Sequence, residues 1–187
     1  MQQLRREWIE YIPHIDVNRL VYLDETSVNI AMTRLYGRAP RGERIYEYVP
    51  DVRFKRISVL STIRVNGTSN PSVYSGTLNG FLFIQYIEVC VIPNLNPLDI
   101  LVMDCLSAHK MKIISEMVES VGANVVYLPP YSPDLNPIET VFSQIKSDLR
   151  KYKPRSVESI CDVITYTFYS ITPAHAQNHF RNCIEGL

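Results

Sequence analysis

The chain has 187 residues, of which 46% are hydrophobic and 20% are charged, which is ordinary for a globular protein. This length predicts one domain with a substantial core. No apolar run reaches the roughly 18 residues that a membrane-spanning helix needs, and the first residues lack the apolar stretch of a signal peptide. The formal net charge of +0 gives no overall indication of a nucleic-acid partner.

The first half of the chain predicts two strand regions and a helix. A buried strand is expected at residues 19–28, bounded by Asn18 and Asn29. A β-hairpin is expected at residues 56–76, where Asn66-Gly67 is a typical turn pair. Apolar residues then recur at helical spacing over residues 79–95, and this helix is expected to end near Pro93. Residues 99–104 form a short apolar run, which is typical of a strand buried on both faces.

The second half predicts a helix over residues 107–122, closed by Gly122, and another buried strand at residues 123–129. Further helices are expected over residues 137–151, 157–171 and 173–183. Because a hairpin precedes a strand–helix–strand unit, this order predicts an α/β fold with a mixed central sheet flanked by helices. We expect one domain, with a core at about residues 18–152 and C-terminal helices within residues 156–183.

Two aspartates stand at the ends of apolar strands, Asp24 in "VYLDE" and Asp104 in "LVMDC". Ligand sites in open α/β sheets lie beyond the carboxyl ends of strands, so both are candidates for a functional site. For either residue the alternative is a strand-end aspartate that forms a turn. Glu25 is a rival for Asp24, because successive strand residues point to opposite faces. The alternation alone does not decide between them.

Glu139 follows a rigid segment, since "YLPPYSPDLNP" holds four prolines in eleven residues. With Asn136 as the N-cap and Pro137 as the first helical residue, Glu139 completes a capping-box pattern. Such a cap stabilises a helix by about 1 kcal/mol and needs no chemistry. The alternative is that the prolines restrict the loop and direct Glu139 toward Asp104. The apolar stripe of this helix is expected to face the core; it comprises Ile138, Val141, Phe142, Ile145 and Leu149.

Basic residues are concentrated in two segments, despite the neutral total. Seven basic residues stand against three acidic ones at positions 34–56, and five against one at positions 146–155. Solvated surface explains each patch by itself. Around an acidic site, however, two such patches are typical of a protein that binds a phosphate backbone.

Four segments together resemble the catalytic domain of the mariner-like DDE transposases, specifically their bacterial insertion-sequence branch. They are "LDETSVN", "MTRLYGRAPRGER", "LVMDCLSAHK" and "LPPYSPDLNPIETVFSQIK", in the order of the family, over about residues 20–152. Thirty-four residues separate Asp104 from Glu139, a spacing typical of this superfamily. The resemblance implies a ribonuclease H-like fold in which Asp24, Asp104 and Glu139 are the catalytic, metal-binding triad.

The resemblance also implies the chemistry and the partners. Two Mg²⁺ or Mn²⁺ ions, about 3.5–4 Å apart, would promote in-line phosphoryl transfer, and hard oxygen ligands suit both metals. Asp24 is expected to bridge the ions, with Asp104 and Glu139 holding one each. The implied reaction is cleavage of DNA at transposon ends followed by strand transfer to target DNA at TA. The implied assembly is a homodimer on paired ends.

Five further residues are expected to contact DNA: Arg38, Arg41, His109, Lys146 and Arg150. His109 fits the family pattern, but a residue of a turn or first helical turn over the sheet edge explains it equally well. Cys105 departs from the pattern, because asparagine usually follows the second aspartate. Cysteine is small and nearly apolar, so the strand end should persist, although a lost side-chain hydrogen bond could weaken the site.

Relatives of this kind carry N-terminal helix-turn-helix domains that read the transposon ends. The first expected strand begins near Arg19, so these domains are expected to be absent. The chain is then expected to be a fragment, the second half of a split reading frame, or a decayed copy. Two alternatives to a transposase follow: a remnant that only binds DNA, and another ribonuclease H-like nuclease. Four scattered cysteines without a CxxC pair argue against a zinc site and favour a reducing, cytoplasmic location. With DNA as partner, this means association with the bacterial nucleoid.

Overall fold

A mixed β-sheet forms the centre of the computed structural model, which describes residues 2–34, 36–48, 56–105 and 111–184. Within these residues, five strands lie in the order β3-β2-β1-β4-β5. The central strand β1 pairs antiparallel with β2 and parallel with β4, while β3 and β5 form the antiparallel and parallel edges. The bounds are β1 Leu20–Val28, β2 Ile57–Ile63, β3 Ser72–Ser75, β4 Ile100–Met103 and β5 Asn124–Tyr127. The predicted mixed sheet is confirmed.

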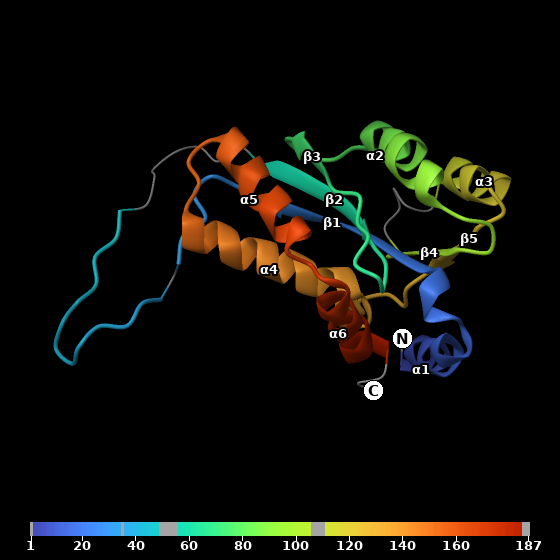
Figure 1. Ribbon diagram of the computed structural model, residues 1–187, viewed down its shortest axis with the longest axis horizontal. Coiled ribbons are helices and arrows are strands. Elements are labelled where there is room, and N and C mark those ends of the chain that lie inside the picture. Colours follow the sequence, from blue (N-terminus) through green and yellow to red (C-terminus); the bar gives the residue numbers. More distant parts are fainter. Residues whose placement is uncertain (1, 35, 49–55, 106–110, 185–187) are drawn as a thin grey trace.

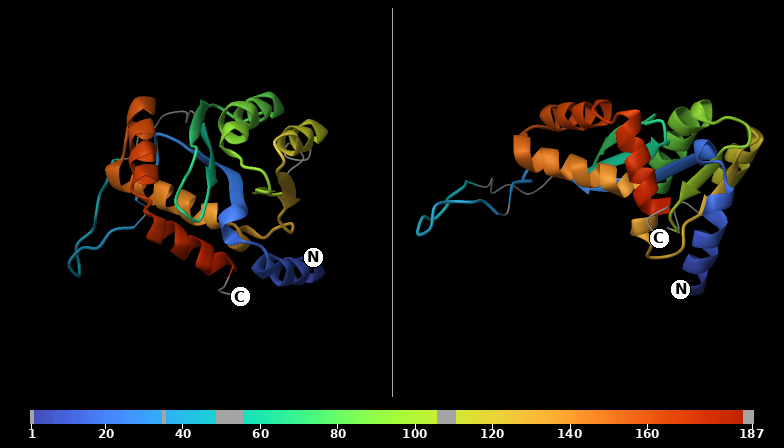
Figure 2. Two further views of the ribbon diagram at one scale, coloured as in Figure 1. Left: turned by 45° about the vertical axis from the view of Figure 1, so that its right-hand side comes forward. Right: turned by 60° about the horizontal axis from the view of Figure 1, so that its bottom comes forward.

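Helices cover both faces of this sheet (Figures 1 and 2). On one face, α4 and its neighbours α5 and α6 pack over a core that includes Tyr22 and Val59. On the other face, α2 and α3 pack over Val21, Leu23 and Leu60. The bounds are α1 Gln2–Tyr11, α2 Gly80–Tyr86, α3 Lys112–Ser120, α4 Pro137–Tyr152, α5 Val157–Tyr169 and α6 Pro173–Ile184. Alternate residues of β1 therefore contribute to two separate cores.

Local sequence signals account for most element boundaries. Asn66 and Gly67 form the hairpin turn, in which the Gly67 N–H donates to the Arg64 carbonyl and Gly67 has a φ of 88°. Gly122 follows α3 with a φ of 77°, as expected of a residue that ends a helix. The apolar stripe of α4, from Ile138 to Leu149, is fully buried. These three predictions are confirmed.

The single helix expected over residues 79–95 is wrong in detail. The segment begins as α2, capped by the Asn79 side chain, which accepts from the Leu82 N–H. It then continues as a π-helical turn over Ile87–Val91 and a 3₁₀ turn over Ile92–Asn94. Pro93 lies in that last turn, and its missing N–H prevents the regular α-helical hydrogen bond.

Helix α1 was not predicted from the sequence. Its ten residues are predominantly polar and only Trp8 is buried, so no apolar run marks the segment as a helix. A salt bridge from Arg5 to Asp134 connects α1 to the loop that precedes α4. No helix among the described residues has the length and apolarity that a bilayer crossing demands.

Between β1 and β2 the chain leaves the body as an exposed arm, defined here as residues 36–48 (Figure 1). All thirteen of its residues are exposed, including the aromatic side chains of Tyr36, Tyr46 and Tyr48. The arm carries part of the first basic patch. Near its end, Glu47 pairs with Lys153, the residue that follows α4.

Candidate active site

Three carboxylates that the sequence singled out line one cavity of about 450 Å³: those of Asp24, Asp104 and Glu139. Asp24 lies on β1, Asp104 directly follows β4, and Glu139 lies in the first turn of α4. The expectation that Asp24 ends its strand is wrong, because β1 continues to Val28. β1 and β4 are parallel and Tyr22 pairs with Val102, so Asp24 and Asp104, each two residues further on, lie at the same level of the sheet. The structure therefore brings together the three residues of the expected triad.

Asp24 is the most constrained of the three carboxylates. Its side chain belongs to a residue that is only 7% exposed, and both of its oxygens accept hydrogen bonds. Oδ1 accepts from the Glu25 N–H at 2.7 Å, and Oδ2 accepts from Asn136 Nδ2 at 2.8 Å. Glu25, its rival, lines a different cavity. Between these two neighbours, Asp24 is the one that shares a cavity with Asp104.

Cys105 retains a hydrogen bond although it replaces the expected asparagine. Its Sγ donates to the Leu128 carbonyl at 3.2 Å, and the Leu128 N–H donates to the Met103 carbonyl at 2.8 Å. These contacts hold the end of β4, just before and after Asp104, against the segment that follows β5. Cys105 therefore still links the end of β4 to the segment after β5 by a side-chain hydrogen bond, although the expected asparagine is absent.

Asn136 has a role that the sequence did not predict. It precedes α4 with an extended backbone, but its side chain makes no capping hydrogen bond to the helix. Instead, its amide nitrogen donates to Asp24, while its Oδ1 is buried with no hydrogen-bond partner. The reciprocal capping box expected for Asn136 and Glu139 is thus wrong, because the asparagine side chain is used elsewhere. Helix α5, by contrast, does form a capping box, between Ser156 and Ser159.

The loop before α4 is held by prolines and by a tertiary ion pair. It contains Pro129, Pro130 and Pro133, and the 3₁₀ turn Pro133–Leu135 leads directly into α4. Arg5 donates two hydrogen bonds to the Asp134 carboxylate, at 2.9 and 2.7 Å. Those bonds hold the pKa of Asp134 below its usual range. The loop is thereby fixed at several points just before Glu139.

The donor chemistry of the cavity suits a hard divalent cation. Its candidate ligands are carboxylate oxygens, which Mg²⁺ and Mn²⁺ prefer. Within the part of the chain that the structure describes, no group of three or more Asp, Glu, His or Cys side chains is already arranged closely enough to coordinate a metal ion. Three carboxylates repel one another without a cation between them, so an open arrangement is what electrostatics predicts for the protein alone.

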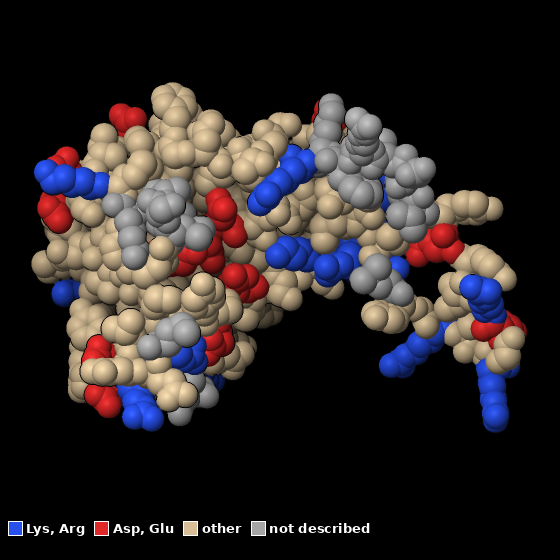
Figure 3. All heavy atoms as spheres, turned by 180° about the vertical axis from the view of Figure 1, so that it is seen from behind, with Lys and Arg blue, Asp and Glu red and all other residues tan. Residues whose placement is uncertain are grey.

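The expected DNA contacts fall in different places. Arg38 and Arg41 lie on the arm. Lys146 and Arg150 lie half-buried on α4, seven and eleven residues after Glu139 along the same edge of the helix. Lys146 and Glu139 line a common second cavity. His109 lies outside the described residues. Figure 3 shows acidic side chains gathered on one face of the body, with basic side chains beside them in the direction of the arm.

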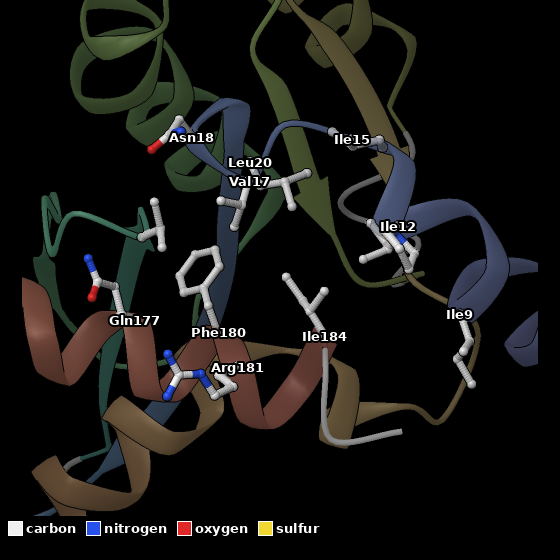
Figure 4. A pocket seen from close by; sticks show the side chains of 12 residues that line it. Ile9, Ile12, Ile15, Val17, Asn18, Leu20, Gln177, Phe180, Arg181 and Ile184 are labelled. Carbon is white, nitrogen blue, oxygen red and sulfur yellow. The ribbon is translucent and has the colours of Figure 1, made fainter.

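A larger cavity, of about 730 Å³, lies between the start of the chain and α6 (Figure 4). Phe180 and Ile184 project into it from α6, opposite Ile12 and Val17. Among the described residues of its wall, Arg181 alone is charged. The described part of its wall offers no carboxylate and no nucleophile, so it does not compete with the carboxylate cavity as a candidate active site.

A comparison with known families agrees with this geometry. The family model described as "DDE superfamily endonuclease" matches residues 19–161, which include all three carboxylates of the cavity. The chain belongs to this family. No curated protein sequence matches the chain.

Several solved structures share the fold of this DDE endonuclease domain. The Mos1 strand transfer complex has a TM-score of 0.80 at 16% identity, covering 99% of this chain and 57% of that one. The mariner Mos1 paired end complex with Mg has a TM-score of 0.80 at 17% identity, covering 98% and 58%. The catalytic domain of Mos1 mariner transposase has a TM-score of 0.70 at 14% identity, covering 98% and 86%. The ribonuclease H-like fold is therefore confirmed, and the chain spans little more than half the length of the transposases in the first two structures.

Proposed function

We propose that this DDE endonuclease domain is the catalytic domain of a transposase. It would cleave DNA strands at transposon ends and join the freed 3′-hydroxyl to target DNA. The observation that carries this proposal is the single cavity lined by Asp24, Asp104 and Glu139, three residues that the family pattern assigns to catalysis. The fold shared with transposases in strand transfer and paired-end complexes supports it.

We propose the same three carboxylates as ligands of two Mg²⁺ or Mn²⁺ ions. Similar folds have been solved with Mg and with Mn, which supports the use of a divalent metal. When bound, such ions supply the positive charge that stabilises phosphoryl transfer. Asp24 lies on the central strand and is the candidate for the shared ligand. Its two hydrogen bonds from Glu25 and Asn136 fix its direction before any metal or DNA arrives.

The proposed partners are transposon-end DNA and target DNA, with two copies of the protein on a pair of ends. Paired-end complexes among the similar structures support this arrangement. The exposed basic residues of the arm and the half-buried cations of α4 are the proposed phosphate contacts. A protein with this substrate would work at the bacterial nucleoid.

Strand cleavage by the full-length parent protein tests the proposal. Wild-type protein should nick a duplex that carries the transposon end in the presence of Mg²⁺, and Asp104→Ala should reduce nicking to background. Glu116→Gln is the matched control, because Glu116 is exposed on α3 and its ion pair is with Lys112, one turn earlier on the same helix. Nicking by Asp104→Ala at the wild-type rate would overturn the assignment.

A further inference from the structure

A second, smaller cavity adjoins the carboxylate cavity and shares Glu139 with it. Its volume is about 230 Å³. The wall is formed by the carboxyl half of β1, the start of β2 and one edge of α4; its residues are Glu25, Thr26, Ser27, Arg56, Ser58, Glu139 and Lys146. Every one of these side chains is polar or charged, which sets this cavity apart from the apolar one beside α6.

The two cations of this cavity have no partner within the described structure. Arg56 directly precedes β2 and Lys146 lies on α4, and neither forms an ion pair or a side-chain hydrogen bond, although Glu25 and Glu139 line the same cavity. Arg64 is a contrasting case, because its guanidinium contacts the buried Asp99 at 2.5 Å. Two unpaired cations that face one small cavity from different elements leave a position for an anion.

Neutral donors complete this position. Thr26 and Ser27 contribute hydroxyl groups from β1, and Ser27 is the cross-strand partner of Ser58. The Ser58 hydroxyl already donates to the Gly76 carbonyl at 2.8 Å, so Thr26 and Ser27 hold the hydroxyl donors that remain. An arginine fork, an ammonium group and hydroxyls are the donors that proteins use for phosphate.

We infer that this cavity binds a backbone phosphate of DNA, one that neighbours the scissile phosphate on the same strand. Glu139 separates the two cavities, so a strand whose scissile phosphate lies against the carboxylates passes its next phosphate toward Arg56 and Lys146. This inference rests on the proposed function. It makes Arg56, which no sequence pattern distinguished from the other basic residues of its segment, a specific contact for strand position.

Binding of a short fluorescent duplex, measured by anisotropy in Ca²⁺, tests the inference without requiring cleavage. Arg56→Gln and Lys146→Gln should each weaken binding and lower the slope of log affinity against log salt by about 0.9. Lys151→Gln is the matched control, because Lys151 is on the same helix and lines neither cavity. Lys146→Arg, which keeps the charge, should restore the slope.

Duplexes with one neutral methylphosphonate locate the contact. At one position next to the scissile phosphate, the modification should weaken wild-type binding and leave the Arg56→Gln, Lys146→Gln double variant unchanged. Equal losses at every position in both proteins would overturn the inference. Competition by inorganic phosphate without any position dependence would also overturn it, since that result means a free-anion site. Failure of the wild-type protein to nick DNA, with this position dependence intact, would count against the proposed function alone.

Discussion

Asn136 connects the two halves of the candidate site at the scale of single residues. It is the residue before α4, and its side chain reaches a carboxylate 112 positions earlier in the chain. Because Asp24 is 7% exposed, the amide that donates to it replaces water that Asp24 has lost. The same amide leaves its own Oδ1 buried and without a partner, so the arrangement favours the orientation of Asp24 over complete hydrogen bonding.

Replacing Asn136 should therefore destabilise the protein. Asn136→Ala removes a hydrogen bond to a buried charge, and the expected loss in free energy of unfolding is about 1–3 kcal/mol. Asn136→Asp should cost more, because it places a second negative charge against Asp24. Urea unfolding at pH 7 measures both. Asn178→Ala, at an exposed position of α6, should change stability by less than about 0.5 kcal/mol; equal effects at the two positions would mean that the Asn136 bond has no energetic weight.

The sequence predicted the carboxylates better than it predicted their surroundings. Asp24 and Asp104 each follow a short apolar run, and a local pattern of that kind is visible without tertiary structure. The choice between Asp24 and Glu25 could not be made from the sequence, because it depends on which face of β1 is covered by α4. Asn136 likewise fits the local pattern of a helix N-cap, but its side chain donates a hydrogen bond to the distant Asp24 carboxylate instead. Local patterns fail where a polar side chain has a better partner far along the chain.

At the scale of elements, α1 contacts and stabilises the loop that positions α4. Its contact with that loop is the ion pair between Arg5 and Asp134, and Trp8 anchors the helix in the core. This helix was not predicted because its residues are predominantly polar and only one of them is buried. The strongly periodic α4, with its six buried residues, was predicted almost to its last residue.

The ion pair predicts a specific pH dependence. The pKa of Asp134 is lowered in the folded protein, chiefly by hydrogen bonds from Arg5, so the pair stabilises the fold at pH values above the unfolded pKa of about 3.9. That contribution disappears as the pH falls through the lower, folded pKa. Asp134→Asn should cost less than about 1 kcal/mol at pH 7, because the side chain of Asp134 is 54% exposed.

Urea unfolding of both proteins across pH 2–7 checks this expectation. The difference in stability between wild type and Asp134→Asn should narrow steadily below about pH 4. A difference that stays constant across this range would show that the carboxylate charge is not the stabilising feature. Arg5→Gln should reproduce the same loss, and the double variant should lose little more than either single one.

At the scale of the whole molecule, a compact α/β body carries one long exposed arm between β1 and β2 (Figure 1). In the sequence, the arm lies between β1, which bears Asp24, and β2, which begins directly after Arg56. Its residues are exposed, so they contribute little to the core. Its length and course could not be predicted from the sequence, because the segment has neither a helical nor a strand period.

Arginines of the arm should affect DNA binding and leave stability unchanged. If Arg38 and Arg41 both contact phosphates, the double variant Arg38→Gln, Arg41→Gln should lower the salt slope of DNA binding by about two. Its thermal midpoint should match wild type. Arg6→Gln on α1, which lies away from the arm, is the matched control (Figure 1). A salt slope equal to that of wild type would return both arginines to ordinary solvated surface.

The central claim is that Asp24, Asp104 and Glu139 together form one divalent-metal site. Thermal unfolding during a Mn²⁺ titration tests it most directly, since a ligand that binds only the folded state at 100 times its Kd adds about 2.7 kcal/mol of stability. Mn²⁺ should raise the Tm of wild type and of Glu25→Gln, whereas Asp24→Asn, Asp104→Asn and Glu139→Gln should lose the rise. The same Tm rise in all five proteins, or none in wild type, would contradict the claim.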